Sequence, residues 1–386
     1  MTRGTGDDEK VRKPESAFAW VEFYHRLAPV TIPLYALLIA LVIGGLVMLM
    51  AGANPLEAYW ALLMGAIGNP HRIVLMLTRS TPYMVAGLAV ALAYRNGLFN
   101  IGAEGQLLMG ALVGVWVGTT AGFAGLPAIV YIPLVMAAGT FGGLVWGGIP
   151  GVLKARTGAH EVIVTIMLNA IAARLVDWIV TSRDPALLID LAASTPRTRT
   201  VADGAVLPAL VPGTGLSTAL LIAIGLCVGV WFLLQRTTIG FEIRMSGINP
   251  SAARYGGVSV PRMTVLVMAA SGALAGLGGA NVVSGTTGHL TPGLLSNIGF
   301  DSIAIALIAR GNPLAVIPAA LLWGGLLSGA PLMQVQADLS IDLVRVVQAC
   351  VILFIAADAI VRTLFRVRAA GAPRAASPPG PDSEVT

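Results

Sequence analysis

Polar side chains gather in two short segments that interrupt long apolar stretches, and they are the residues most able to do chemistry. The first segment, residues 100–106, reads NIGAEGQ and contains Asn100, Glu104 and Gln106. Its glycines permit a break in a helix, and the new helix start leaves free backbone amides that favour an anion such as Glu104. The segment therefore predicts either a polar site at a broken helix or a capped helix entry at a membrane interface.

The second segment repeats this pattern later in the chain. Asn297 begins the run NIGFD, which ends at Asp301 and has asparagine, isoleucine, glycine and an acid at the same offsets. Both copies precede apolar runs. A repeat of this kind, in opposite membrane orientations, often places a binding site at broken helices near the bilayer midplane. We expect Asn297 and Asp301 to belong to the same polar pathway as the first copy.

A third set of polar residues follows helical spacing within an apolar stretch. Glu161, Thr165 and Asn169 are four residues apart, so they share one helical face. That face predicts either a stripe along the pathway, favoured for Glu161 and Asn169, or hydrogen bonds between helices, favoured for Thr165. Arg174 and Asp177 are spaced to pair with each other.

The composition indicates the elements that must position these residues. Apolar residues make up 56% of the 386-residue chain and charged residues only 11%. A soluble domain needs more polar surface, so the sequence predicts an all-α polytopic membrane protein. The composition excludes a secreted enzyme, a disordered chain and a nucleic-acid binder. The two cysteines, Cys227 and Cys350, lie in apolar runs and predict buried side chains without a disulfide.

Common catalytic and cofactor motifs are missing from the sequence. None of the three lysines follows a glycine, so the chain has no P-loop for ATP. The four histidines are scattered and predict no metal site, and no nucleophile triad can be argued from spacing. We expect no catalytic residue, metal or cofactor in this chain.

About ten membrane segments follow from windows of about 20 apolar residues. The full-length candidates are residues 32–51, 73–94, 106–124, 127–149, 160–182, 216–234, 263–283 and 343–362. Residues 298–330 are interrupted before Pro313, which predicts a half-helix at 298–309 and a fuller helix at 314–330. Asn54–Gly68 is too short to span and predicts an interfacial helix on the outer side.

The basic residues predict the orientation. With the N-terminus inside and a hairpin at Gly311, 17 of the 24 Lys and Arg residues fall inside, four outside and three within spans. We therefore expect both termini in the cytoplasm. The predicted divisions are a cytoplasmic segment 1–29, a membrane domain 30–365 and a disordered tail 366–386, with an external loop at 183–215 and a cytoplasmic loop at 235–262.

The cytoplasmic loop contains a predicted short helix that suits docking to a partner. Asn249 is a good N-cap, Pro250 suits the first turn, and Gly256-Gly257 end the helix. Its alternative is an ordinary solvated surface loop.

Four separate runs resemble motifs of one transporter family. They are residues 99–110 (FNIGAEGQLLMG), 160–172 (HEVIVTIMLNAIA), 240–257 (GFEIRMSGINPSAARYGG) and 299–313 (GFDSIAIALIARGNP). Together they resemble permease subunits of bacterial importers driven by ATP-binding cassettes (ABC importers), in the group for branched-chain amino acids, simple sugars and nucleosides. The wording FNIGAEGQ is most similar to that of guanosine-type nucleoside permeases.

The resemblance implies a division of labour among several proteins. A binding protein outside delivers the solute, this chain and a second homologous permease form the pathway, and a partner ATPase with two nucleotide-binding domains holds ATP and magnesium. The resemblance implies that the chain is a transport subunit of the bacterial plasma membrane and not an enzyme. The coupling residues that it implies are Arg244, Gly247, Asn249, Pro250, Ala252, Ala253 and Gly256. Gly247→Trp or Ala253→Arg is then expected to uncouple ATP hydrolysis from uptake without unfolding the membrane domain.

Two other functions compete with nucleoside import. A permease of the same group could carry simple sugars or branched-chain amino acids. A passive channel or ion-coupled transporter would belong to another class, but a passive pore needs no docking helix and an ion-coupled transporter usually carries more intramembrane carboxylates.

Overall fold

The structure is a computed structural model that describes residues 38–338, 340, 342–343, 345–346 and 349–350. These residues form helices, turns and three isolated β-bridges. Six helices in this part of the chain are long and apolar enough to cross a membrane. They are α3 (Pro70–Arg95), α5 (Ala128–Thr157), α6 (Glu161–Thr181), α7 (Ala219–Arg236), α10 (Val260–Val282, continued by the π-helical turn η3, Val283–Thr287) and α12 (Pro313–Gln336). The prediction of an all-α polytopic membrane protein is confirmed, whereas most of the predicted span 343–362 lies outside the described residues.

Further helices in the described part of the chain pack with these six. They include α4 (Ala103–Thr119), α11 (Ile298–Ile308) and α2 (Pro55–Ile67), which follows the helix Leu38–Met50 at a bend of 120°. If this bent pair counts as one crossing, up to seven spans are present among the described residues. α2 packs against α12, where Gly65 meets Gly329, so it is a packed helix and not only a surface one.

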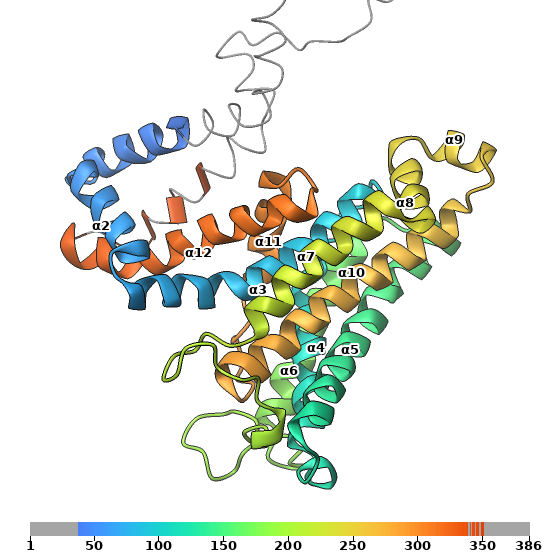
Figure 1. The fold of residues 1–386 in the computed structure, drawn as a ribbon, viewed down its shortest axis with the longest axis horizontal. Helices are drawn as coiled ribbons and strands as arrows, with labels where there is room; N and C mark the ends of the chain where they lie inside the picture. The colour runs from blue at the N-terminus through green and yellow to red at the C-terminus, as the bar shows by residue number, and fades with distance from the viewer. Residues whose placement is uncertain (1–37, 339, 341, 344, 347–348, 351–386) are drawn as a thin grey trace, which may run out of the picture.

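Glycine contacts hold together the helices at the centre of the molecule, α4, α5 and α10 (Figure 1). A Cβ at Gly276 of α10 would lie 2.7 Å from the Cα of Gly143 in α5, and one at Gly110 of α4 would strike the Gly276 backbone. α5 and α10 run in opposite directions, since Gly151 faces Val265 and Gly139 faces Ala280. Small residues let helix backbones approach closely, which adds packing contacts where lipid offers little drive for association.

The break predicted before Pro313 is present. α11 ends at Ile308, the backbone turns through Arg310 (φ 50°) and Gly311 (φ 66°), and α12 begins at Pro313. The Arg95 side chain at the end of α3 donates a 2.7 Å hydrogen bond from Nε to the Gly311 carbonyl. The turn therefore lies at the same end of the bundle as the C-terminus of α3, as the hairpin prediction requires.

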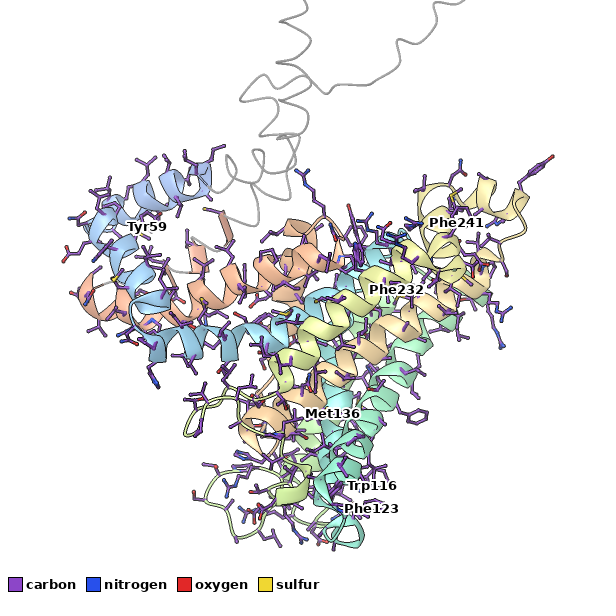
Figure 2. All side chains as sticks on the ribbon, in the orientation of Figure 1. Tyr59, Trp116, Phe123, Met136, Phe232 and Phe241 are labelled. Atoms are coloured by element: carbon purple, nitrogen blue, oxygen red, sulfur yellow. The ribbon has the colours of Figure 1, made fainter. Side chains whose placement is uncertain are left out.

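The two long connecting segments lie at opposite ends of the bundle (Figure 1). At one end are α8 (Thr238–Ile248) and the short helix α9 (Pro250–Tyr255), and we call this the α9 end. At the other end is the segment between α6 and α7, which contains a 3₁₀ turn, η2 (Asp203–Ala205). The α4–α5 connection, with the 3₁₀ turn η1 (Ala121–Phe123), lies at the same end. In Figure 2, Trp116 and Phe123 mark this second end, which we call the loop end.

The helix α8 differs from the prediction of a cytoplasmic loop over 235–262. Thr237 caps α8 by accepting a 3.0 Å hydrogen bond from the amide of Gly240, and α8 buries Ile243 and Ser246 against its neighbours. The sequence obscures this helix because charged and polar residues lie among its few apolar positions. The segment is thus largely helical, and only α9 and its flanks project.

The packing of the two halves is reciprocal. α3, before the first Asn-Ile-Gly segment, packs against α11 and α12, whereas α10, before the second, packs against α4 and α5. Each half therefore contributes one long helix to the other half. This exchange was not predicted from the repeat, which indicated only two copies in opposite orientations.

Candidate functional site

The two Asn-Ile-Gly segments meet at one point of the structure. The Glu104 carboxylate accepts hydrogen bonds from the backbone amides of Asn297 (2.9 Å) and Gly299 (3.2 Å). Glu104 lies in the first turn of α4, and the two amides lie at the start of α11. One carboxylate thus sits at the N-termini of two helices, where both dipoles favour negative charge.

This contact explains why the second copy needs its asparagine and glycine. Asn297 precedes α11 with a left-handed backbone (φ 69°), which asparagine adopts more readily than most residues, and its side chain does not cap the helix. A Cβ at Gly299 would strike the Glu104 backbone. The first unpaired amides of α11 are therefore satisfied by a residue from the other half of the chain.

Asn100 and Gln106 lie on the buried side of the same junction. Asn100 is 1% exposed, and its amide nitrogen donates to Gln106 Oε1 (2.8 Å) and Ser271 Oγ (2.7 Å). Its carbonyl oxygen accepts from the Gly102 amide at 3.0 Å, and Ser271 donates onward to the Ala89 carbonyl. A buried amide with this many partners fixes the turn before α4 and ties it to α10 and α3.

The polar stripe on α6 also faces inward. Asn169 accepts from the Gly105 amide and donates to the Ile101 carbonyl, both at 2.9 Å, and Thr165 bonds the Glu161 carbonyl. Glu161 forms an ion pair with Lys154 at the end of α5. The predicted common face is present, and it holds α6 against the start of α4.

Asp301 lies one turn into α11 and joins an aromatic pair. Its carboxylate accepts a 3.3 Å hydrogen bond from Trp323 Nε1 of α12, and it also interacts with Tyr83 of α3. Phe300 and Asn297 are exposed beside it. Because a carboxylate within a membrane-embedded helix is rarely found against lipid, the partly exposed surface around Asp301 is suited to an aqueous pathway or to a partner.

The structure separates the seven pathway candidates into two groups. Asn100, Gln106, Glu161 and Asn169 are buried and paired within the protein, whereas Glu104, Asn297 and Asp301 meet at the α4–α11 junction with some surface open. Sequence reasoning missed Ser271, Tyr83 and Trp323. A serine in an apolar run is a usable sign of Ser271, but nothing distinguishes the two aromatic residues from ordinary apolar ones.

The predicted docking helix is present as α9. Asn249 accepts from the amides of Ser251 (3.1 Å) and Ala252 (3.0 Å), Pro250 fills the first turn, and Gly257 follows with φ 85°. Ile248 lies shortly before α9, Tyr255 is the last residue of α9, and Tyr255 is 98% exposed. The protein thus presents a small helix edged by two apolar side chains at the α9 end.

The coupling candidates do not all lie on this surface. Asn249, Pro250, Ala252 and Gly256 are exposed, and Arg244 is half-buried with a hydrogen bond to Gln235. Ala253 is 2% exposed, and a Cβ at Gly247 would strike the backbone of Arg95 and Asn96. Gly247→Trp and Ala253→Arg would therefore disturb the packing of the α9 end itself, so they do not test docking separately from the local fold.

Comparison with known proteins places these features in a family. Residues 72–356 match the family of branched-chain amino acid transport system permease components. The guanosine ABC transporter permease protein NupP of Bacillus subtilis is 38% identical over 340 residues, covering 87% of this chain and 96% of NupP. The nucleoside ABC transporter permease protein NupB of Lactococcus lactis is 35% identical over 342 residues, covering 87% of this chain and 93% of NupB.

Other relatives extend the comparison. The glucose ABC transporter permease protein TsgB13 of Haloferax volcanii is 33% identical over 333 residues, covering 84% of this chain and 86% of TsgB13. A second guanosine permease of Bacillus subtilis, NupQ, is 27% identical over 258 residues, covering 64% of this chain and 78% of NupQ. No solved structure shows a significant match. From the family match and the near full-length similarity to three permeases, this multi-pass membrane protein belongs to the family of branched-chain amino acid transport system permease components.

Proposed function

We propose that this chain is the permease subunit of an ATP-driven ABC importer that moves a nucleoside into the cell. The observation that carries the proposal is the 38% identity to a guanosine permease over 96% of that protein's length. The α4–α11 junction supports it, since the starts of two helices meet there and each carries an acidic residue, Glu104 or Asp301, in its first turn. So does α9, because a passive pore needs no projecting helix for a partner.

The proposal assigns each region a task. Glu104, Asn297 and Asp301 line the solute pathway, while Asn100, Gln106, Glu161 and Asn169 keep its walls in place. Reciprocal packing of the two halves lets a small rotation of one half open the junction to either side, as expected for alternating access. The α9 end transmits the motion of the ATPase, with Asn249, Pro250, Ala252 and Gly256 at the contact and Arg244, Gly247 and Ala253 behind it.

The proposal also defines the partners. A second permease completes the pathway, an ABC ATPase with two nucleotide-binding domains binds ATP and magnesium, and an extracytoplasmic binding protein delivers the solute. The existence of both NupP and NupQ for guanosine in one bacterium supports a pair of unlike permeases. The assembly lies in the bacterial plasma membrane with both termini of this chain in the cytoplasm.

The affinity of the partner binding protein tests the substrate. We expect the purified partner binding protein to bind guanosine or a related nucleoside tightly in calorimetry. Glucose and leucine, measured on the same preparation, should bind at least about a thousandfold more weakly, a difference of about 4 kcal/mol. Tight binding of leucine with none of a nucleoside would contradict the proposal.

A simple sugar is the second candidate substrate. It is favoured by the similarity to the glucose permease TsgB13, which also extends over most of both chains. The same titrations decide between the two, because a sugar importer would show tight binding of glucose and none of guanosine.

A further inference from the structure

Of the six long apolar helices in the described part of the chain, α6 is covered least by the rest of the protein. In its most apolar stretch 22% of the residues are buried, against 33% in α5 and α7 and 61% in α10 with η3. Its buried stripe faces α4 and α5, as described above. The opposite stripe, which we call the outer face of α6, consists of the exposed residues Ile163, Met167, Ile171, Arg174 and Trp178 and the half-buried Asp177.

Charge on this outer face argues against contact with lipid. Arg174 and Asp177 form an ion pair at 3.8 Å, and the arginine side chain is 88% exposed. Arg174 lies seven residues before the end of α6 at Thr181, which is about 10 Å along a helix. Charged side chains at such depth are found against other proteins or water-filled cavities rather than lipid.

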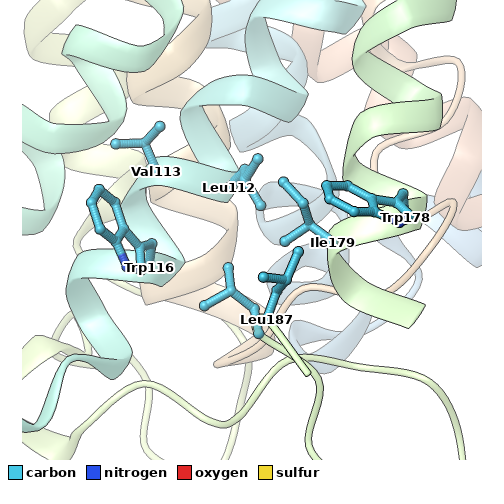
Figure 3. A pocket seen from close by; sticks show the side chains of 7 residues that line it. Leu112, Val113, Trp116, Trp178, Ile179 and Leu187 are labelled. Carbon is cyan, nitrogen blue, oxygen red and sulfur yellow. The ribbon is translucent and has the colours of Figure 1, made fainter. Parts of the chain in front are cut away.

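A hollow continues the outer face toward the loop end. It has a volume of about 400 Å³ and is lined by Leu112, Val113, Trp116, Trp178, Ile179, Leu187 and Leu188 (Figure 3). Trp116 and Trp178 flank it and are 59% and 55% exposed. Exposed tryptophans around an apolar hollow are typical of the anchor positions of protein interfaces.

We propose that the outer face of α6, with this hollow, binds the second permease subunit of the importer. The inference rests on the proposed function, which supplies a second permease. A permease is the partner that fits, since the face runs along a membrane helix where neither the ATPase nor the binding protein can reach. An apolar helix with a polar group opposite Arg174 and Asp177 would cover the stripe, and one of its side chains would enter the hollow.

Exchange of the two charges tests this proposal directly. The double variant Arg174→Glu, Asp177→Arg keeps an ion pair within α6 but reverses the charges shown to a partner. We expect at least about tenfold less of the second permease to co-purify with it, while co-purification of the ATPase per folded chain is unchanged. Equal recovery of the second permease would overturn the proposal, because a lipid-facing pair would tolerate the exchange.

Cross-linking provides a second readout that does not depend on the stability of the variant. In a background with Cys227→Ala and Cys350→Ala, a cysteine at Met167 or Ile171 should form a cross-link with the second permease, identified by mass spectrometry. The control is Val228→Cys, an exposed position on α7, and it should form no such cross-link. Phe232, labelled in Figure 2, lies one turn further along the same helix. If the cysteine at position 167 or 171 reacts only with membrane-soluble reagents, the outer face of α6 contacts lipid. If it reacts only with water-soluble reagents, this face lines an aqueous pathway. Either result overturns the proposal.

The two tests separate this inference from the proposed function. If wild-type complexes import a nucleoside with ATP but the α6 variants assemble normally, only the inference fails. If no ATP-dependent import occurs although the permeases cross-link through α6, the proposed function fails and the interface remains.

Discussion

At the scale of single residues, Glu104 is the side chain on which the junction depends. Its carboxylate satisfies two amides of α11 while its own backbone begins α4. A charged acceptor at a helix start stabilises a protein by about 1–2 kcal/mol. This contact also connects the two halves of the chain, so its loss should affect their relative movement.

Glu104→Gln removes the charge and leaves a single amide oxygen as acceptor. We expect a loss of stability of about 1 kcal/mol in thermal unfolding and a reduction of uptake by about tenfold in proteoliposomes. The control is Glu57→Gln, an exposed acid in the first turn of α2, which should change neither quantity. If Glu104→Gln lowers stability and leaves uptake intact, Glu104 is a cap and not part of the pathway.

The sequence identified the polar residues of the site but not where their side chains point. Asn100 and Glu104 lie in one short motif, yet one side chain is buried in a network and the other crosses to α11. A single sequence reveals the residue types and a helical period. The repeat placed the residues near 100 and 297 in one pathway, but it did not reveal the hydrogen bonds between them, because those depend on how the two halves pack.

At the scale of elements, the glycine contacts among α4, α5 and α10 set the close spacing of the central helices. Gly276 faces Gly139 and Gly143, with no room for a side chain. Gly225 on α7 has open space around its Cβ position. The two positions thus differ in packing although both are helical glycines in apolar runs.

We predict opposite effects of alanine at these two positions. Gly276→Ala should destabilise the protein by at least about 2 kcal/mol, because backbone must shift to admit the methyl group. Gly225→Ala should be neutral or stabilise by up to about 1 kcal/mol through helix propensity. The thermal stability of each variant is measured as the amount of folded protein that remains on size-exclusion chromatography after graded heating. Equal thermal stability of the two variants would show that the backbones at Gly276 are not in close contact.

The α9 end allows a test of docking that avoids the buried positions. Ile248→Ser and Tyr255→Ser remove exposed apolar groups, so we expect normal folding with about tenfold weaker binding of the ATPase. Ser251→Ala, an exposed change on the same helix, serves as the control in a pull-down of the ATPase. ATPase binding that survives the combined loss of both apolar groups would exclude α9 as the main contact.

Element boundaries were predictable where the chain carries strong local signals. Asn312 and Pro313 mark the start of α12, and Asn249 and Pro250 mark that of α9, because capping and proline chemistry are local. The helix α8 was not predicted, since it depends on burial against α7 and α3 rather than on its own pattern.

At the scale of the whole molecule, basic residues collect at the α9 end. They lie at the ends of α3, α5 and α7, in α8 and α9, and in the α11–α12 turn; they include Arg95, Lys154, Arg156, Arg236, Arg244, Arg254 and Arg310. Arg183, Arg197 and Arg199 belong to the segment at the loop end. The positive-inside rule therefore predicts that the α9 end faces the cytoplasm.

Labelling of single cysteines tests this orientation. In a background without the native cysteines, Ser251→Cys and Asn312→Cys should react with a membrane-impermeant maleimide only after the cells are opened. Ala193→Cys, in the loop segment, should react in intact cells. Labelling of Asn312→Cys in intact cells would contradict the hairpin and would show that the second half of the chain has the opposite membrane orientation.

Import of a labelled nucleoside into proteoliposomes tests the central claim most directly. The vesicles contain this chain with its second permease and ATPase, and the binding protein loaded with radiolabelled guanosine is added outside. We predict accumulation above the external concentration that requires enclosed ATP and magnesium and falls about tenfold in Glu104→Gln. Equilibration that proceeds equally without ATP would identify a passive channel and contradict the account.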